Sequence, residues 1–137
     1  MAVSTEEQSA TAPTRVVAIL HEWIPVRDLE VSTRFYAEVL GLEIIPRPEF
    51  PRPGVWFGDG SGNLEIHLTL MPSAPFLTAG AGPGNRHTAF AVTDLNALRE
   101  RLRALDIPWF EQTGFIQSNQ LFINDPDGNT LEFQQVS

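Results

Sequence analysis

Four side chains of this 137-residue sequence could together hold a metal ion. His21, His67 and His87 are the only histidines of the chain, and Glu132 is close to its C-terminus. Neutral imidazoles combined with a carboxylate suit a divalent transition metal, whereas Ca²⁺ requires more oxygen ligands. On an octahedral ion, four protein ligands leave two neighbouring positions for two oxygens of a substrate, toward which the metal acts as a Lewis acid. The candidate cofactor is therefore Zn, Ni, Co, Fe or Mn.

Each of these residues also has a simpler interpretation. A single histidine in a strand more often has a structural role than a ligating one. A glutamate on a buried face is costly unless it is paired, so a salt bridge to an arginine is the alternative for Glu132. The interpretation as ligands therefore depends on whether all four side chains face the same cleft.

Side chains alternate between the two faces of a strand, and this alternation places the four candidate ligands on the same face of the expected sheets. Apolar residues at the alternate positions would pack beneath helices, so the other positions line a concave surface. Two candidate ligands from each half of the chain would converge on this cleft. Its other lining residues would be Trp23, Glu65, Thr69, Ala89, Gln120, Phe122 and Gln134.

The composition excludes several classes of function. Nine arginines, no lysine and 17 acidic residues give a formal charge of −8, which argues against a nucleic-acid partner because such a partner needs a basic surface. Without cysteine or lysine there is no thiol nucleophile, disulfide or Schiff-base lysine. No apolar run approaches the roughly 20 residues that span a bilayer, so no membrane partner is expected. The N-terminus lacks the features of a signal peptide, which favours a cytoplasmic location.

The elements that would carry the candidate ligands occur twice along the chain. After a flexible polar tail over residues 1–14, the first module covers residues 15–70 and the second covers residues 87–137, with a Pro- and Gly-rich linker over 71–86. Asp28 and Asp94 are the expected N-caps of two amphipathic helices, which would extend through Leu40 and Leu105. The strands indicated by apolar and β-branched runs are Arg15–Val26, Leu42–Ile45, Val55–Phe57, Leu64–Leu70, His87–Val92, Ile107–Phe110, Leu121–Ile123 and Thr130–Gln135.

An internal repeat relates the two modules. Six residue types recur at an offset of 66 positions, in the pairs His21 and His87, Asp28 and Asp94, Leu29 and Leu95, Asp59 and Asp125, Gly62 and Gly128, and Asn63 and Asn129. The chain is therefore expected to be a tandem duplication of a βαβββ unit, one α+β domain over residues 15–137 whose modules pair into a concave mixed sheet. At this offset Glu132 corresponds to Ile66, so one turn must differ by a residue. Either His67 or Glu65 could then be the counterpart of Glu132.

Four segments of the sequence resemble the vicinal oxygen chelate superfamily, which includes glyoxalases, bleomycin resistance proteins and extradiol dioxygenases. The segments are His21–Glu43, Gly62–Leu68, Arg86–Leu102 and Gln120–Phe133. The resemblance implies a glyoxalase-like fold with metal ligands on the first, fourth, fifth and eighth strands. Transferred to this sequence, those ligands are His21, His67, His87 and Glu132. Homodimers are common in the superfamily, so a homodimer is expected, with modules that pair within one chain or are swapped between two.

Two positions narrow the choice of substrate. Glyoxalase I-like enzymes typically hold glutathione with an Arg four residues after the first ligand and an Asn four residues after the fourth-strand ligand. This sequence has Pro25 and Met71 at those places, which argues against glutathione. Arg47 and Arg52 could receive an anionic substrate at the mouth of the cleft, although solvated surface charges are the simpler interpretation.

The expected function is that of a metal-dependent, glyoxalase-like enzyme acting on a small organic substrate with adjacent oxygens. The metal would act as the Lewis acid, and Glu132 or Glu65 would transfer a proton, as in a lyase or isomerase. One alternative is a ring-cleaving dioxygenase, in which a ligand at His67 would occupy a position that oxygen needs. The other is a non-catalytic antibiotic- or small-molecule-binding protein of the bleomycin-resistance type.

Overall fold

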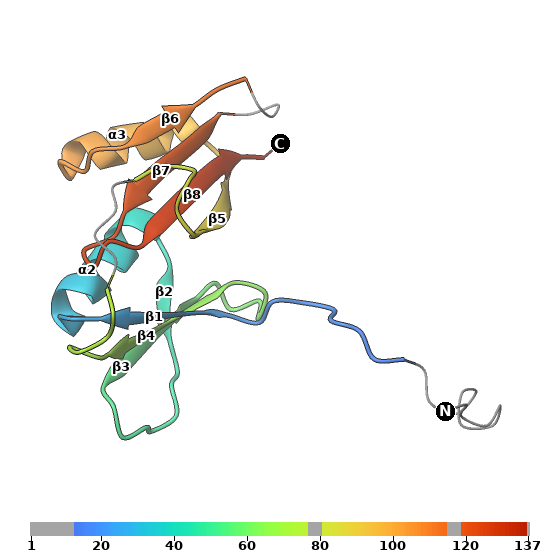
Figure 1. Ribbon diagram of the computed structural model, residues 1–137, viewed down its shortest axis with the longest axis vertical. Helices are drawn as coiled ribbons and strands as arrows, with labels where there is room; N and C mark the ends of the chain where they lie inside the picture. The colour runs from blue at the N-terminus through green and yellow to red at the C-terminus, as the bar shows by residue number, and fades with distance from the viewer. Residues whose placement is uncertain (1–12, 77–80, 115–118, 137) are drawn as a thin grey trace.

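The computed structural model describes residues 13–76, 81–114 and 119–136, which form two successive βαβββ modules (Figure 1). The first module contains β1 (Glu22–Val26), α2 (Leu29–Leu40), β2 (Glu43–Ile45), β3 (Gly54–Gly58) and β4 (Glu65–Leu70). The second contains β5 (His87–Val92), α3 (Leu95–Ala104), β6 (Phe110–Gln112), β7 (Gln120–Asn124) and β8 (Thr130–Gln135). The predicted tandem repeat and α+β fold are confirmed.

The two modules have the same sheet topology. The strand order is β1-β4-β3-β2 in the first and β5-β8-β7-β6 in the second, with β1 and β5 parallel to their neighbours and the other pairs antiparallel. Within the described residues these are two separate hydrogen-bonded sheets rather than one continuous sheet. Neither helix of the described residues has the length and apolar character needed to cross a membrane.

Both helices begin at the predicted caps. The carboxylate of Asp28 accepts a hydrogen bond from the backbone N–H of Val31 at 3.1 Å, and Asp94 accepts one from Ala97 at 3.0 Å. These contacts satisfy N–H groups that lack a partner within the helix. Helix α2 ends at Gly41, whose φ of 67° is a left-handed conformation that glycine adopts without strain.

One hydrophobic core is continuous across both modules. Its fully buried members come from both sheets and both helices, and they include Tyr36, Phe57, Ile66, Leu68, Leu102, Leu121, Ile123 and Leu131. Removing this apolar surface from water holds the two modules together as one body.

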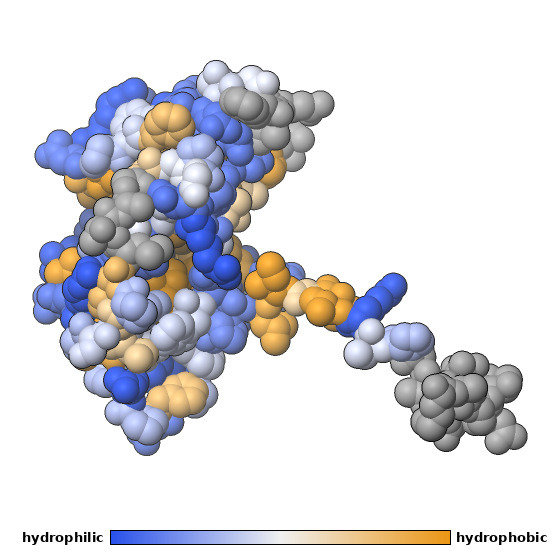
Figure 2. Space-filling view, viewed as in Figure 1, coloured by the Kyte–Doolittle hydropathy of each residue, from blue (hydrophilic) through white to orange (hydrophobic). Residues whose placement is uncertain are grey.

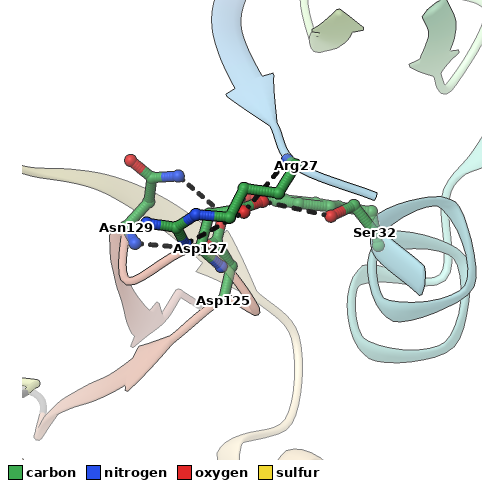
Figure 3. Close-up of polar contacts among 6 residues, drawn as sticks. Arg27, Ser32, Asp125, Asp127 and Asn129 are labelled. Carbon is green, nitrogen blue, oxygen red and sulfur yellow. Dashed lines mark hydrogen bonds and ion pairs between the residues drawn. The ribbon is translucent and has the colours of Figure 1, made fainter. Parts of the chain in front are cut away.

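A polar contact also joins the modules, at the turn between β7 and β8 (Figure 3). Asp127 accepts hydrogen bonds from the backbone N–H of Arg27 at 3.1 Å and from the hydroxyl of Ser32 at 3.3 Å. Asp125, in the same turn, accepts one from the phenol of Tyr36 at 2.6 Å. Both aspartates are almost fully buried, and buried carboxylates require such partners. The turn therefore fixes the start of α2 against the second module.

The first strand is shorter than predicted. β1 begins at Glu22, whereas the apolar pattern indicates a strand from Arg15. In the described part of the preceding segment, residues 13–20 extend away from the body without a partner strand, and their apolar character is visible in Figure 2. A β-branched sequence favours extended backbone, but a strand also needs a hydrogen-bonded neighbour. Residues 1–12, most of the predicted tail, lie outside the described residues.

The sixth strand begins three residues later than predicted. Residues 107–109 belong instead to the turn that follows α3, where Ile107 donates a backbone hydrogen bond to the carbonyl of Leu102 at 2.9 Å. Asp106 has a φ of 56°, and Pro108 has no N–H to give to a ladder. These residues end the helix rather than extend the sheet.

Candidate metal centre

Strand register identifies the counterpart of Glu132 in the first module. Trp23 pairs with His67 in the parallel β1–β4 ladder, and Ala89 pairs with Glu132 in the parallel β5–β8 ladder. Trp23 and Ala89 are 66 positions apart, so their partners, His67 and Glu132, occupy equivalent places. Glu65 lies two residues earlier on the same face of β4.

The one-residue difference lies in the turn between β3 and β4. Phe57 pairs with Ile66 across this turn, whereas Ile123 pairs with Leu131 across the corresponding turn of the second module. Nine positions separate the first pair and eight the second. The inserted residue explains why the offset of 66 holds through Asn63 in the turn and changes to 65 in β4.

The first module stacks its two histidines. The rings of His21 and His67 lie 3.9 Å apart at an interplanar angle of 17°, and the indole of Trp56 lies 3.8 Å from the ring of His67 at 2°. Nε2 of His67 is 2.9 Å from Oε1 of Glu65. Parallel rings cannot both direct an in-plane lone pair at one ion, so shared ligation requires a ring to rotate. His21 can do so because it precedes β1, while His67 is buried between two rings.

The second module places His87 against Glu132. Nε2 of His87 is 3.0 Å from Oε1 of Glu132, and its Nδ1 is 2.6 Å from the carbonyl oxygen of Asn85. A carbonyl only accepts, so Nδ1 carries the proton of this ring. Nε2 then faces a carboxylate, an arrangement that needs a second proton or a shared cation. The backbone carbonyl thus directs Nε2 toward Glu132, the kind of outer hydrogen bond that orients histidine ligands in known metal sites.

Glu132 is buried, and two glutamine side chains donate to it. It is 3 % exposed, and its Oε2 accepts hydrogen bonds from the side chains of Gln120 at 3.3 Å and of Gln134. Phe122 packs edge-on against His87 with ring centres 5.4 Å apart. No arginine pairs with Glu132 in the described part of the chain, so the salt-bridge interpretation does not apply there. A buried carboxylate beside an oriented imidazole fits a divalent ion.

The expected ligands form two pairs rather than one cluster. Within residues 13–76, 81–114 and 119–136, no three histidine or acidic side chains gather closely enough to hold a metal ion. His21 and His67 line a cavity of about 770 Å³ together with the expected Trp23, Glu65 and Thr69. Ala89, Gln120, Phe122 and Gln134 surround Glu132 on the other sheet. A single chain, in this arrangement, carries two halves of the expected site.

Sequence reasoning missed two contributors to this geometry. Trp56 stacks on His67, and the carbonyl of Asn85 fixes the orientation of His87. Trp56 pairs directly with His67 across β3 and β4, so correct register would have identified it. A backbone carbonyl gives no signal in the sequence.

Comparison with known proteins identifies the family. The family model of the Glyoxalase/Bleomycin resistance protein/Dioxygenase superfamily matches residues 15–133. "Glyoxylase I 4" of Arabidopsis thaliana is 31% identical over 133 residues, which is 92% of this chain and 75% of that protein. The lactoylglutathione lyase of Haemophilus influenzae is 32% identical over 123 residues, which is 84% of this chain and 90% of that protein.

A solved structure shows the same similarity. The crystal structure of lactoylglutathione lyase from Agrobacterium tumefaciens has a TM-score of 0.64 and 25% identity, covering 91% of this chain and 96% of that one. Several relatives named as lyases also match along most of the chain, and the family implies dependence on a divalent metal. The chain belongs to the Glyoxalase/Bleomycin resistance protein/Dioxygenase superfamily, and it is a glyoxalase-like enzyme of the lyase type.

Proposed function

We propose that two copies of this chain form a metal-dependent enzyme in which each site combines His21 and His67 of one chain with His87 and Glu132 of the other. The substrate is a small organic molecule with two adjacent oxygens. The separation of the donors into two well-formed pairs supports this assignment. Three imidazoles and one carboxylate match a divalent transition metal once the pairs meet.

The exposed segment before β1 supports a homodimer. Val16, Val17, Ile19 and Leu20 are 71–92% exposed, and His21 follows them directly. Consecutive apolar residues in unpaired extended backbone form a template for pairing with another chain. A second copy that covers this segment would also bring its own residues close to His21.

The proton-transfer role falls to Glu65. Its carboxylate lines the cavity beside His67 and is partly exposed to it. Both oxygens of Glu132 already have partners, Oε1 facing His87 and Oε2 accepting from two glutamines. Glu65 can therefore take a proton from a carbon of a bound substrate and return it, while Glu132 serves as a ligand. When bound, the metal supplies Lewis-acid polarisation of the substrate oxygens.

Mixing two deficient variants tests the shared site. His67→Ala and Glu132→Ala each lack one ligand in every site, so each alone should bind metal weakly. A heterodimer of the two regains one intact site, formed by the first module of Glu132→Ala and the second module of His67→Ala. We expect metal analysis after equilibration to give about one tightly bound ion per heterodimer, together with recovered activity.

A matched mixture provides the control. His67→Ala and His21→Ala are both altered in the first module, so their heterodimer contains no intact site and should regain nothing. If neither mixture recovers metal while the wild-type chain binds it, the site lies within one chain. If the wild-type chain binds no divalent ion, the enzyme assignment to this site is wrong and the binding-protein alternative is favoured.

A further inference from the structure

The cavity of about 770 Å³ in the first module has an aromatic lining. Its floor is β4, and one wall is the Pro-rich segment over residues 46–53. Trp23 and Phe50 are about half exposed, at 48% and 51%. Large aromatic side chains that gather around a cavity with their surfaces open bind flat apolar molecules.

The aromatic side chains of the lining present mainly their ring surfaces to the cavity. The indole N–H of Trp23 donates to the hydroxyl of Thr69 at 2.8 Å. The indole ring of Trp56 stacks on His67. The ring of Phe50 is tilted relative to that of Trp56, with ring centres 6.1 Å apart. These aromatic residues therefore expose apolar ring surface to the cavity, and Met71 also contributes to its lining.

Two arginines, Arg47 and Arg52, line the same cavity, and no described carboxylate forms an ion pair with either. Arg47 is held in place, because its Nη2 donates to the carbonyl of Arg52 at 2.8 Å and its guanidinium lies 4.8 Å above the ring of Phe50. Its Nε is buried and has no acceptor among the described residues. A cation fixed in this way, with unused donors, is organised to receive an anion.

The acidic chain leaves the cationic groups of this cavity available to an anion. With a formal charge of −8, carboxylates are in excess. Three arginines of the described residues pair with carboxylates, namely Arg27 with Asp127, Arg34 with Glu30 and Arg99 with Glu111, whereas Arg101 contacts a backbone carbonyl and Arg103 an aromatic ring. Glu65 also lines the cavity, but its carboxylate contacts His67, and no ion pair joins a carboxylate to Arg47 or Arg52 among the described residues.

We propose that this cavity binds an aromatic substrate whose carboxylate contacts Arg47 and Arg52 while its two adjacent oxygens face His21 and His67. This inference rests on the proposed function and gives its substrate class. The aromatic walls then hold the ring between the two polar ends.

Calorimetric binding of simple aromatic probes tests the inference. 3,4-Dihydroxybenzoate carries adjacent oxygens and a carboxylate at the opposite end of one ring, and catechol is the same molecule without the carboxylate. With metal-loaded protein, we expect 3,4-dihydroxybenzoate to bind at least about tenfold more tightly than catechol, a factor worth ~1.4 kcal/mol. Arg52→Gln should remove this preference and leave catechol binding unchanged.

Two controls keep the result interpretable. Arg34→Gln removes an exposed cation on α2 that pairs with Glu30, and it should preserve the full preference. A comparison of the binding affinities of benzoate and benzyl alcohol, measured after the metal is removed with a chelator, tests the carboxylate contact alone. A benzoate preference that Arg52→Gln abolishes supports the inference even if the metal site fails.

Three outcomes would overturn the inference. One is equal binding of catechol and 3,4-dihydroxybenzoate. Another is an equal effect of Arg52→Gln and Arg34→Gln. The third is tighter binding of S-methylglutathione than of any aromatic probe, which would identify a peptide substrate instead. Because Arg47 packs beneath the loop, Arg52→Gln is the primary variant and Arg47→Gln the second.

Discussion

The phenol of Tyr36 donates a 2.6 Å hydrogen bond to Oδ2 of Asp125, across the junction of the two modules. Both side chains are buried. Burial raises the pKa of Tyr36 well above its usual value, and the neighbouring negative charge of Asp125 adds to this. Burial also raises the pKa of Asp125, which the hydrogen bonds from Tyr36 and Asn129 oppose. This contact positions α2, and through it β1 and His21, relative to the second module.

Tyr36→Phe removes this hydrogen bond without removing the ring. We expect the free energy of unfolding to fall by about 1.5–3 kcal/mol, because a buried charged acceptor loses a donor. Chemical denaturation at neutral pH measures the change. Ser61→Ala is the control, since Ser61 makes a similar contact to Asp59 on an exposed turn. An equally small effect of both substitutions would contradict a role for the junction contact.

The cost of Tyr36→Phe should depend on pH. A raised carboxyl pKa means that the folded state binds a proton more readily than the unfolded state, so stability from this group falls as pH rises through the folded pKa of Asp125. Loss of the phenol raises that pKa further. Denaturation of both proteins should therefore show a larger stability difference at about pH 7 than at about pH 4. A constant difference across this range would contradict a change in the ionisation of Asp125 between these two pH values.

Glu111 should support the fold at neutral pH and lose this effect in acid. The hydrogen bond from Arg99 lowers the pKa of Glu111 from 4.5 to about 2. The stabilisation is complete above the unfolded pKa and is lost as pH falls toward 2. Glu111→Gln should cost about 1–2 kcal/mol at neutral pH, after allowance for partial exposure, and almost nothing in strong acid.

Thermal and chemical unfolding across the acid range check the Glu111 prediction. Glu30→Gln is the matched control, because Glu30 pairs with Arg34 on the surface and its side chain is 85% exposed. It should leave stability unchanged at every pH. If both variants behave alike, the contact between α3 and β6 is not the source of the effect.

Charged residues in the segment before β1 should weaken the dimer. Val17→Lys combined with Ile19→Lys places two cations in the exposed apolar segment, and we expect the dissociation constant to rise at least about tenfold. Sedimentation velocity over a concentration series measures it, and metal binding should weaken in parallel. Val31→Lys, which alters an exposed apolar residue of α2, should change neither. A wild-type monomer at micromolar concentration would refute the dimer.

Gly54→Ala should disturb both the first sheet and Arg47. A Cβ at Gly54 would lie 2.4 Å from the backbone carbonyl oxygen of Leu68 and 2.8 Å from Nη2 of Arg47. The sheet cannot yield easily at a backbone atom, so we expect a loss of about 2 kcal/mol or more in the free energy of unfolding. Gly82→Ala has nothing within 4 Å of the added carbon and serves as the control. Equal stability of the two variants would contradict this close approach.

The sequence predicts local structure well wherever one local signal decides it. Asp28 and Gly41 bound α2 as expected, and β5 and β8 have the predicted limits, because caps and alternation act over a few residues. The strand limits of residues 15–21 were predicted wrongly because pairing depends on a neighbour that the sequence of one segment does not reveal. The same applies to residues 107–109, where the end of α3 takes precedence.

The sequence allowed the residues of the candidate site to be predicted, but not how the fold brings them together. Alternation and the repeat select His21, His67, His87 and Glu132, and register distinguishes His67 from Glu65. The division into two pairs depends on how the modules pack, which the junction at Asp125 and Asp127 helps to set. No local pattern encodes that packing.

In the proposed dimer, the division of the donors would make metal affinity depend on protein concentration. If each complete site draws on two chains, dilution separates the donors and releases the ion, while added metal favours association by mass action. Metal occupancy then reports how much of the protein is assembled, so a dilute preparation will look metal-poor although every ligand is intact. Loading experiments on this protein therefore need the chain concentration stated beside the metal concentration.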